Sequence, residues 1–119
     1  NKMLGTILIA LIAILHVYIL VLEMFLWDKP YGLKAFGNTL EKAQLTKVLA
    51  QNQGLYNGFL AAGLFWSLLA PTACAVAIAN FFLGCVLVAG IYGGLTASKK
   101  IIYIQAVPAL ITLIVVNLF

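Results

Sequence analysis

Arginine is absent from the 119 residues, and the chain has only one histidine, two cysteines and three acidic residues. Arginine is the side chain best suited to bidentate recognition of carboxylates and phosphates. One histidine and two cysteines cannot form the familiar zinc patterns. Cys74 and Cys85 lie in one apolar run, about 16 Å apart along a helix, which is too far for a disulfide. We therefore predict no metal site and no cofactor.

Charged residues are also scarce, at 8% of the chain, whereas 65% of the residues are hydrophobic. Soluble domains have roughly 45–50% apolar residues, so this composition predicts a membrane protein. A span of the bilayer takes about 20 residues, which allows four spans within a single domain, residues 1–119. The net charge of +4 comes from seven lysines beside the apolar runs. Lysines beside apolar runs are expected to contact anionic lipid headgroups, and we predict no nucleic-acid partner.

The apolar runs predict four transmembrane helices, at about residues 3–27, 47–70, 73–95 and 101–119, in an all-α four-helix bundle. Pro30 and Gly32 are expected to end the first helix, and Thr39 or Asn38 is a candidate N-cap before the second span. Six lysines lie in loops on one side, against Lys2 alone on the other. By the positive-inside rule both termini are non-cytoplasmic, in a multi-pass protein of the bacterial inner membrane.

The second span carries two different arcs on its helical wheel. At about 100° per residue, polar side chains fill an arc of roughly 140° and small residues fill the opposite arc. Small residues let helices approach closely, so we expect the second arc to pack against another helix or subunit. The polar arc contains Asn52, Gln53, Tyr56, Asn57 and Gly63, and the small-residue arc contains Gly54, Gly58, Ala61 and Ala62.

Two ionisable residues lie within the first span, where His16, Glu23 and Trp27 share one helical face. An ionisable side chain at the bilayer centre costs about 2.5–3.5 kcal/mol on insertion scales, and such residues often have a function. Glu23 could act as a base, as a proton carrier or as the counter-charge for a cation. It could equally be a structural carboxylate bonded to Asn52 and Tyr92. His16 could be a packing residue with one interhelical hydrogen bond.

Depth in the membrane, counted at about 1.5 Å per helical residue, places polar residues of all four helices at similar levels. This predicts a polar pocket in the cytoplasmic third of the bundle, which binds a small amphipathic molecule or a lipid. The candidate catalytic residues are Glu23, His16 and Tyr56. The candidate ligand-binding residues are Glu23, Asn52, Gln53, Tyr56, Asn57, Tyr92 and Gln105.

Three segments carry a family resemblance that covers nearly the whole chain. The segments HVYILVLEMFLW, AFGNTLEKA and VLAQNQGLYNGFLAAGL resemble a small bacterial membrane family, catalogued as domain of unknown function 1304. This resemblance implies a membrane protein and brings no established activity.

A more distant pattern is similar to the MAPEG superfamily, the membrane-associated proteins of eicosanoid and glutathione metabolism. The pattern consists of KAFGNTLEKA, Asn52, Gly84 with Tyr92, and YIQAVPAL. It implies a four-helix subunit in a homotrimer, favoured over a dimer, with glutathione bound near the cytoplasmic side. The superfamily's span-two Arg is missing here, Leu55 replaces its Glu, and Cys85 stands at the position of its catalytic Arg. These departures disfavour glutathione as a ligand.

The sequence leaves three functions open. The first is binding of an amphipathic molecule without catalysis, and the second is proton-coupled export through Glu23. The third is a MAPEG-like transferase or isomerase activity on a lipophilic substrate, with Glu23, His16 or Tyr56 as acid or base. Because Glu23 lies near a membrane face and no catalytic motif is present, the sequence favours binding.

Overall fold

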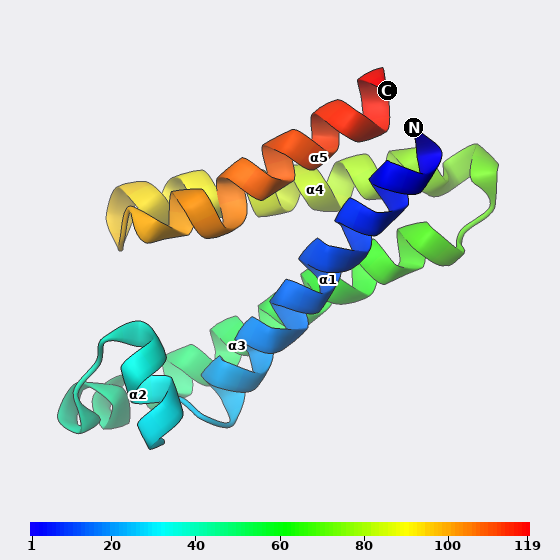
Figure 1. Ribbon diagram of the computed structural model, residues 1–119. Coiled ribbons are helices and arrows are strands. Elements are labelled where there is room, and N and C mark those ends of the chain that lie inside the picture. The colour runs from blue at the N-terminus through cyan, green and yellow to red at the C-terminus, as the bar shows by residue number, and fades with distance from the viewer. The chain divides into compact units, whose positions relative to one another are not determined.

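The computed structural model describes residues 1–119 and contains helices and their connections, without strands (Figure 1). The all-α prediction is therefore confirmed. In chain order the elements are α1 (Lys2–Met24), α2 (Pro30–Phe36), α3 (Leu40–Leu69), α4 (Thr72–Thr96), the π-helical segment η1 (Ile102–Ala106) and α5 (Val107–Leu118).

The first two predicted helices have different ends in the structure. α1 ends at Met24, before the predicted residue 27, and α3 begins at Leu40, seven residues before the predicted residue 47. The hydroxyl Oγ1 of Thr39 accepts a hydrogen bond from the backbone N–H of Lys42 at 3.2 Å. This is the bond of an N-cap residue, so the predicted cap at Thr39 is confirmed.

The short helix α2 lies in the segment that was predicted to be a connection. Pro30 occupies its first turn, where the missing N–H has no cost, so this proline begins a helix and does not end α1 as predicted. After the last turn Gly37 adopts φ 60°. Its N–H donates to the carbonyl of Lys34, and the N–H of Asn38 donates to that of Leu33. This Schellman pattern satisfies the last carbonyls of α2.

Two helices, α1 and α4, are long and apolar enough to cross a membrane, as judged by length and composition. The second predicted span, at 47–70, falls within α3, whose first half carries charged and amide side chains. The fourth consists of η1 and α5, a 17-residue apolar stretch at Ile102–Leu118, whereas a span takes about 20 residues. The spans at 47–70 and 101–119 stay predictions, as does the orientation of the termini.

The chain divides into two compact units, residues 1–13 with 62–119, and residues 14–61. Both divisions fall within helices, α1 and α3. The prediction of a single domain over residues 1–119 is not tested by this division.

In the first unit, α4 and the η1–α5 segment lie side by side and run in opposite directions (Figure 1). Gly90 permits a close backbone approach, because a Cβ atom there would lie 2.5 Å from the backbone N of Ala106. Farther along the same pair, the amides of Asn80 and Asn117 donate to one another at 2.9 and 2.8 Å. The N–H of Val107 bonds to the carbonyl of Ile102, a π-type bond that keeps the backbone paired just before Pro108.

In the second unit, α3 packs on α1 through two glycines. A Cβ atom on Gly54 would lie 2.6 Å from Cγ of Met24 and 3.1 Å from Cβ of Glu23, and one on Gly58 would lie 2.6 Å from Cδ1 of Leu20. The prediction that these glycines pack against another helix is confirmed, and that helix is α1.

The two predicted arcs of α3 do not lie on opposite sides of this contact, which corrects the sequence interpretation. The buried positions in this part of α3 are Ala43, Ala50, Gly54, Asn57 and Ala61, spaced as on one helical face. This stripe includes members of both arcs, because α1 covers the border between them. The remaining polar side chains of the arc, including Asn52 and Tyr56, are exposed.

Candidate functional site

The central side chain of residues 14–61 is Glu23, which lies in the last turn of α1 and is only 3% exposed. Nε2 of Gln53 donates to its Oε2 at 2.9 Å, and Nδ2 of Asn57 donates to its Oε1 at 2.6 Å. Gln53 and Asn57 are one turn apart on α3, and Gly54 between them lets α3 approach α1 closely. The result is a buried carboxyl group with one amide donor on each oxygen.

Other predicted site residues of this unit lie apart from that carboxyl group. Asn52 donates its amide to the backbone carbonyl of Val48 at 2.8 Å, so the expected hydrogen bond from Asn52 to Glu23 is wrong. Tyr56 is exposed, and His16 is fully buried, seven residues before Glu23 on α1. The amides that bond Glu23 therefore come from one edge of the predicted polar arc.

Two further predicted residues, Tyr92 and Gln105, belong to the first unit. Tyr92 is an exposed residue of α4, and Gln105 lies in η1 and is half-buried. Their predicted place beside Glu23 stays a prediction.

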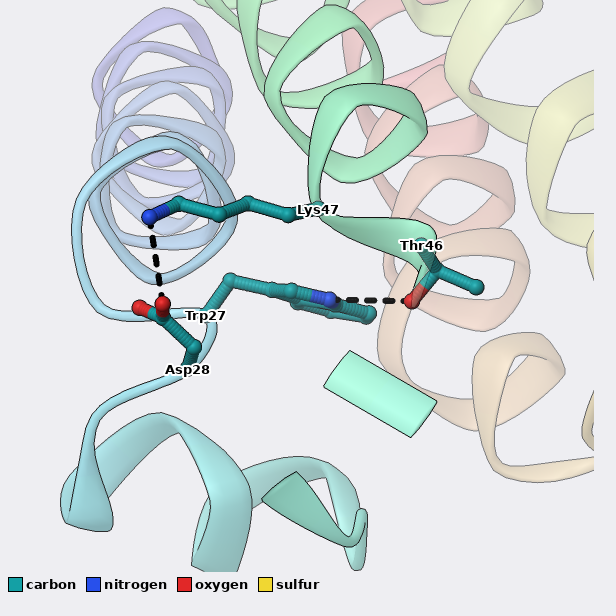
Figure 2. Close-up of polar contacts among 4 residues, drawn as sticks. All are labelled: Trp27, Asp28, Thr46 and Lys47. Carbon is teal, nitrogen blue, oxygen red and sulfur yellow. Dashed lines mark hydrogen bonds and ion pairs between the residues drawn. The ribbon is translucent and has the colours of Figure 1, made fainter. Parts of the chain in front are cut away.

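A pair of polar contacts joins the end of α1 to the beginning of α3 (Figure 2). Nε1 of Trp27 donates to Oγ1 of Thr46 at 3.1 Å, and Nζ of Lys47 lies 3.1 Å from Oδ2 of Asp28. The Trp27 ring also packs against Phe36 of α2, with ring centroids 4.9 Å apart. Two neighbouring residues after α1 thus bond two neighbouring residues of α3, and fix the indole between α2 and α3.

The ion pair gives a pH-dependent contribution to stability. The hydrogen bond from Lys47 lowers the pKa of Asp28 below its ordinary value, against the opposing effect of partial burial. The charged form is therefore favoured in the folded protein, and this stability is present above the unfolded pKa of about 3.9. It is lost as the pH falls through the lower folded pKa.

We expect Asp28→Asn to give a small decrease in the unfolding temperature at pH 7, since one partner of the ion pair is half exposed. The difference between wild type and variant should vanish below the folded pKa of Asp28. It should also shrink at about 1 M salt, where charges are screened within a few ångströms. Circular dichroism in detergent across this pH range measures the effect. A difference that persists at low pH and high salt would contradict an electrostatic cause.

A groove of about 430 Å³ lies beside the bonded pair Trp27 and Thr46 and is also lined by Glu23. Along α3, Lys42 lines one end and Gln53 lines the other, eleven residues or about 16 Å away. Leu45 and Leu49 lie between them, and Glu23 contributes from α1. The groove therefore has polar ends and a mainly apolar middle, in which the Thr46 hydroxyl accepts the bond from Trp27. Its lining consists of Glu23, Trp27, Asn38, Lys42, Leu45, Thr46, Leu49, Ala50 and Gln53.

Of the predicted ligand-binding residues, Glu23 and Gln53 line the groove. Asn57 does not line it, but donates a hydrogen bond to Glu23. Sequence reasoning missed Trp27 and the groove residues in the first part of α3. Six residues of α3 line the groove, and the steps between them along the chain are three, one, three, one and three, which is the pattern of a single helical face. These residues are Lys42, Leu45, Thr46, Leu49, Ala50 and Gln53. The signal was present in the sequence, and a helix that begins at residue 47 cannot display it.

Comparison with known proteins gives a consistent result. The model of a family described as a protein of unknown function (DUF1304) matches residues 10–117. The uncharacterized protein YpaA of Lactococcus lactis subsp. lactis (strain IL1403) is 32% identical over 106 residues, which cover 87% of this chain and 88% of that protein. No solved structure matches. The chain therefore belongs to the DUF1304 family of proteins of unknown function.

Proposed function

We propose that this protein is a multi-pass protein of the bacterial inner membrane that binds one small amphipathic molecule in the groove of residues 14–61. The observation that carries the proposal is the order of side chains along the groove. Leu45 and Leu49 lie between the polar residues at its two ends. A molecule with a polar group and an apolar body would match this order.

The apolar middle of the groove can supply the affinity. Leu45 and Leu49 are 79% and 73% exposed, so a bound apolar group would remove much of their surface from solvent. Burial of apolar surface contributes about 25 cal/mol per Å². The polar ends would then orient the molecule, as the few polar groups of small-molecule sites do.

The position of Glu23 supports binding over proton-coupled export. Glu23 precedes the last residue of α1, and α1 is one of the two helices long enough to cross a membrane. If α1 spans the bilayer, the carboxyl group lies near a membrane face. Coupling sites of secondary transporters lie near the midplane. A site near the face suits a molecule that reaches it from the headgroup layer.

The proposal is tested with three probes that share an eight-carbon chain: octanol, octylammonium and octyl sulfate. The protein is placed in phosphatidylcholine nanodiscs with Trp66→Phe, which leaves Trp27 of the groove as the single tryptophan. We expect a saturable change in Trp27 fluorescence with at least one probe, absent from empty nanodiscs. Leu49→Asn should weaken this binding about tenfold, because an apolar contact worth roughly 1.5 kcal/mol is lost.

Leu55→Asn is the matched control, since Leu55 is another exposed leucine of α3 that does not line the groove. Its affinity should equal that of the parent protein. The proposal fails if none of the three probes gives a saturable signal, or if Leu49→Asn and Leu55→Asn have the same effect.

A further inference from the structure

We propose, on the basis of the function proposed above, that the molecule in the groove is a single-chain amphiphile whose ammonium head group pairs with the carboxylate of Glu23. The inference assigns a charge to the ligand and a place to its head group. It rests on the surroundings of Glu23 and on the distribution of charge along the groove.

The Glu23 carboxyl group is buried, and neither of its hydrogen-bond partners is a cation. Its hydrogen-bond partners are the neutral amides of Gln53 and Asn57, one on each oxygen. Each carboxylate oxygen has a second acceptor site, so the group can still accept bonds from an ammonium. A buried charge is costly unless it is paired. A bound ammonium would supply the counter-charge and could donate to the acceptor sites that the two amides leave open.

The two lysines of α3 are paired with another residue or lie at the other end of the groove. Lys47 forms the ion pair with Asp28. Lys42 lines the opposite end of the groove, eleven residues or about 16 Å from Gln53 along α3. A cation beside Glu23 would therefore not meet Lys42 at close range. The Glu23 end is the negative end of the groove, and the Lys42 end is the positive one.

Trp27 adds a second group that attracts cations. It lines the groove together with Glu23, and its bond to Thr46 restricts the movement of the indole ring. Tryptophan is the strongest cation–π partner among the aromatic residues, within about 6 Å of the ring. A carboxylate and an indole in one lining are the groups that recognise an alkylammonium. The indole is bonded to Thr46, between the two ends, and an anionic head group beside Glu23 would meet no lysine there.

The ammonium could belong to a free amine or to a lipid head group, and the size of the groove favours the free amine. About 430 Å³ lies in the lower part of the range for sites of drug-sized molecules. We therefore commit to a free single-chain amine over the head group of a two-chain lipid. Nanodiscs made with phosphatidylethanolamine separate these sources, since every lipid in them presents an ammonium. Retained binding of octylammonium there supports the free amine, and its loss would overturn that assignment.

The decisive measurement compares octylammonium, octanol and octyl sulfate in the single-tryptophan protein. We expect octylammonium to bind about ten- to a hundredfold more tightly than octanol, the range of a charge-assisted hydrogen bond. Glu23→Gln should remove this preference and keep the affinity for octanol. Lys34→Gln should keep the preference, because Lys34 is an exposed lysine that does not line the groove.

The three probes are compared in protein that keeps Glu23. The ammonium assignment can therefore be tested even if Glu23→Gln fails to fold. Equal affinity for octanol and octylammonium, or tightest binding of octyl sulfate, would overturn the ammonium assignment while the amphiphile site stands. Failure of all three probes to bind would instead reject the site itself.

Discussion

Gly32→Ala is expected to destabilise the protein by about 1–3 kcal/mol, the usual cost of an overpacked position. Gly32 is a buried residue of α2. A Cβ atom on it would lie 1.8 Å from the carbonyl oxygen of Leu26 and 2.6 Å from its carbonyl carbon. Both are backbone atoms, which cannot rotate away as a side chain can. The substitution must therefore move α2 or the chain after α1.

Trp27 makes this movement observable. A Cβ atom on Gly32 would also approach Cα of Trp27 at 3.3 Å, and the Trp27 ring packs against Phe36 at the end of α2. We therefore expect a changed Trp27 emission and weaker binding of octylammonium, together with a lower unfolding temperature by circular dichroism.

Gly84→Ala is the matched control, because it adds the same methyl group to a helix where no atom lies within 4 Å. Alanine favours a helix over glycine by up to about 1 kcal/mol, so this variant should be as stable as wild type or more stable. If both variants have the same unfolding temperature, the close approach at Gly32 does not determine stability.

The helices of this protein were largely predictable, because long apolar runs favour helices in the membrane whatever their neighbours are. The boundaries near residues 24–47 were not. The residues from Leu40 to Lys47 have no long apolar run, and they continue α3 as a helix capped by Thr39. Bonds from Trp27 and Asp28 then hold the start of α3, and such tertiary contacts leave no local signal in the sequence. Pro30 was ambiguous in itself, since proline both ends helices and begins them.

The site shows a similar division between what a helical wheel gives and what packing decides. Counting depth predicted polar partners for Glu23, but the partners it named were Asn52 and Tyr92. The wheel grouped Gln53 and Asn57 on the polar face of α3. It could not show which edge of that face α1 covers. The glycines Gly54 and Gly58 decide this, since the helices approach most closely where side chains are smallest. That approach brings Gln53 and Asn57 to Glu23 and leaves Asn52 exposed.

A double-mutant cycle on Glu23 and Asn57 is expected to show strong coupling. Asn57 is 7% exposed and Glu23 is 3% exposed, so each would lack solvent if its partner were removed. Glu23→Leu leaves a buried amide donor unpaired, and Asn57→Leu leaves a buried carboxyl group with Gln53 alone. Each single variant should lose about 1–3 kcal/mol of stability, the cost of an unsatisfied buried polar group.

The double variant should recover most of this loss, because two leucines remove both polar groups together. The coupling energy is expected at about 1–3 kcal/mol, measured from unfolding in detergent with increasing denaturant. Gln53→Leu is the comparison, since it removes the donor to the other carboxyl oxygen, while Gln53 itself is exposed and no buried donor is left. Additive losses in the cycle would show that the hydrogen bond at 2.6 Å makes no cooperative contribution.

The same double variant separates the two roles that the sequence leaves open for Glu23. If the carboxyl group serves only to hold α1 against α3, a leucine pair of equal stability should leave probe binding unchanged. If it serves to bind an ammonium, the double variant should be stable, should bind octanol, and should have lost its preference for octylammonium. Hydrophobic pairs can replace buried polar pairs without loss of stability. A buried carboxyl group at this position would then be explained by binding and not by folding.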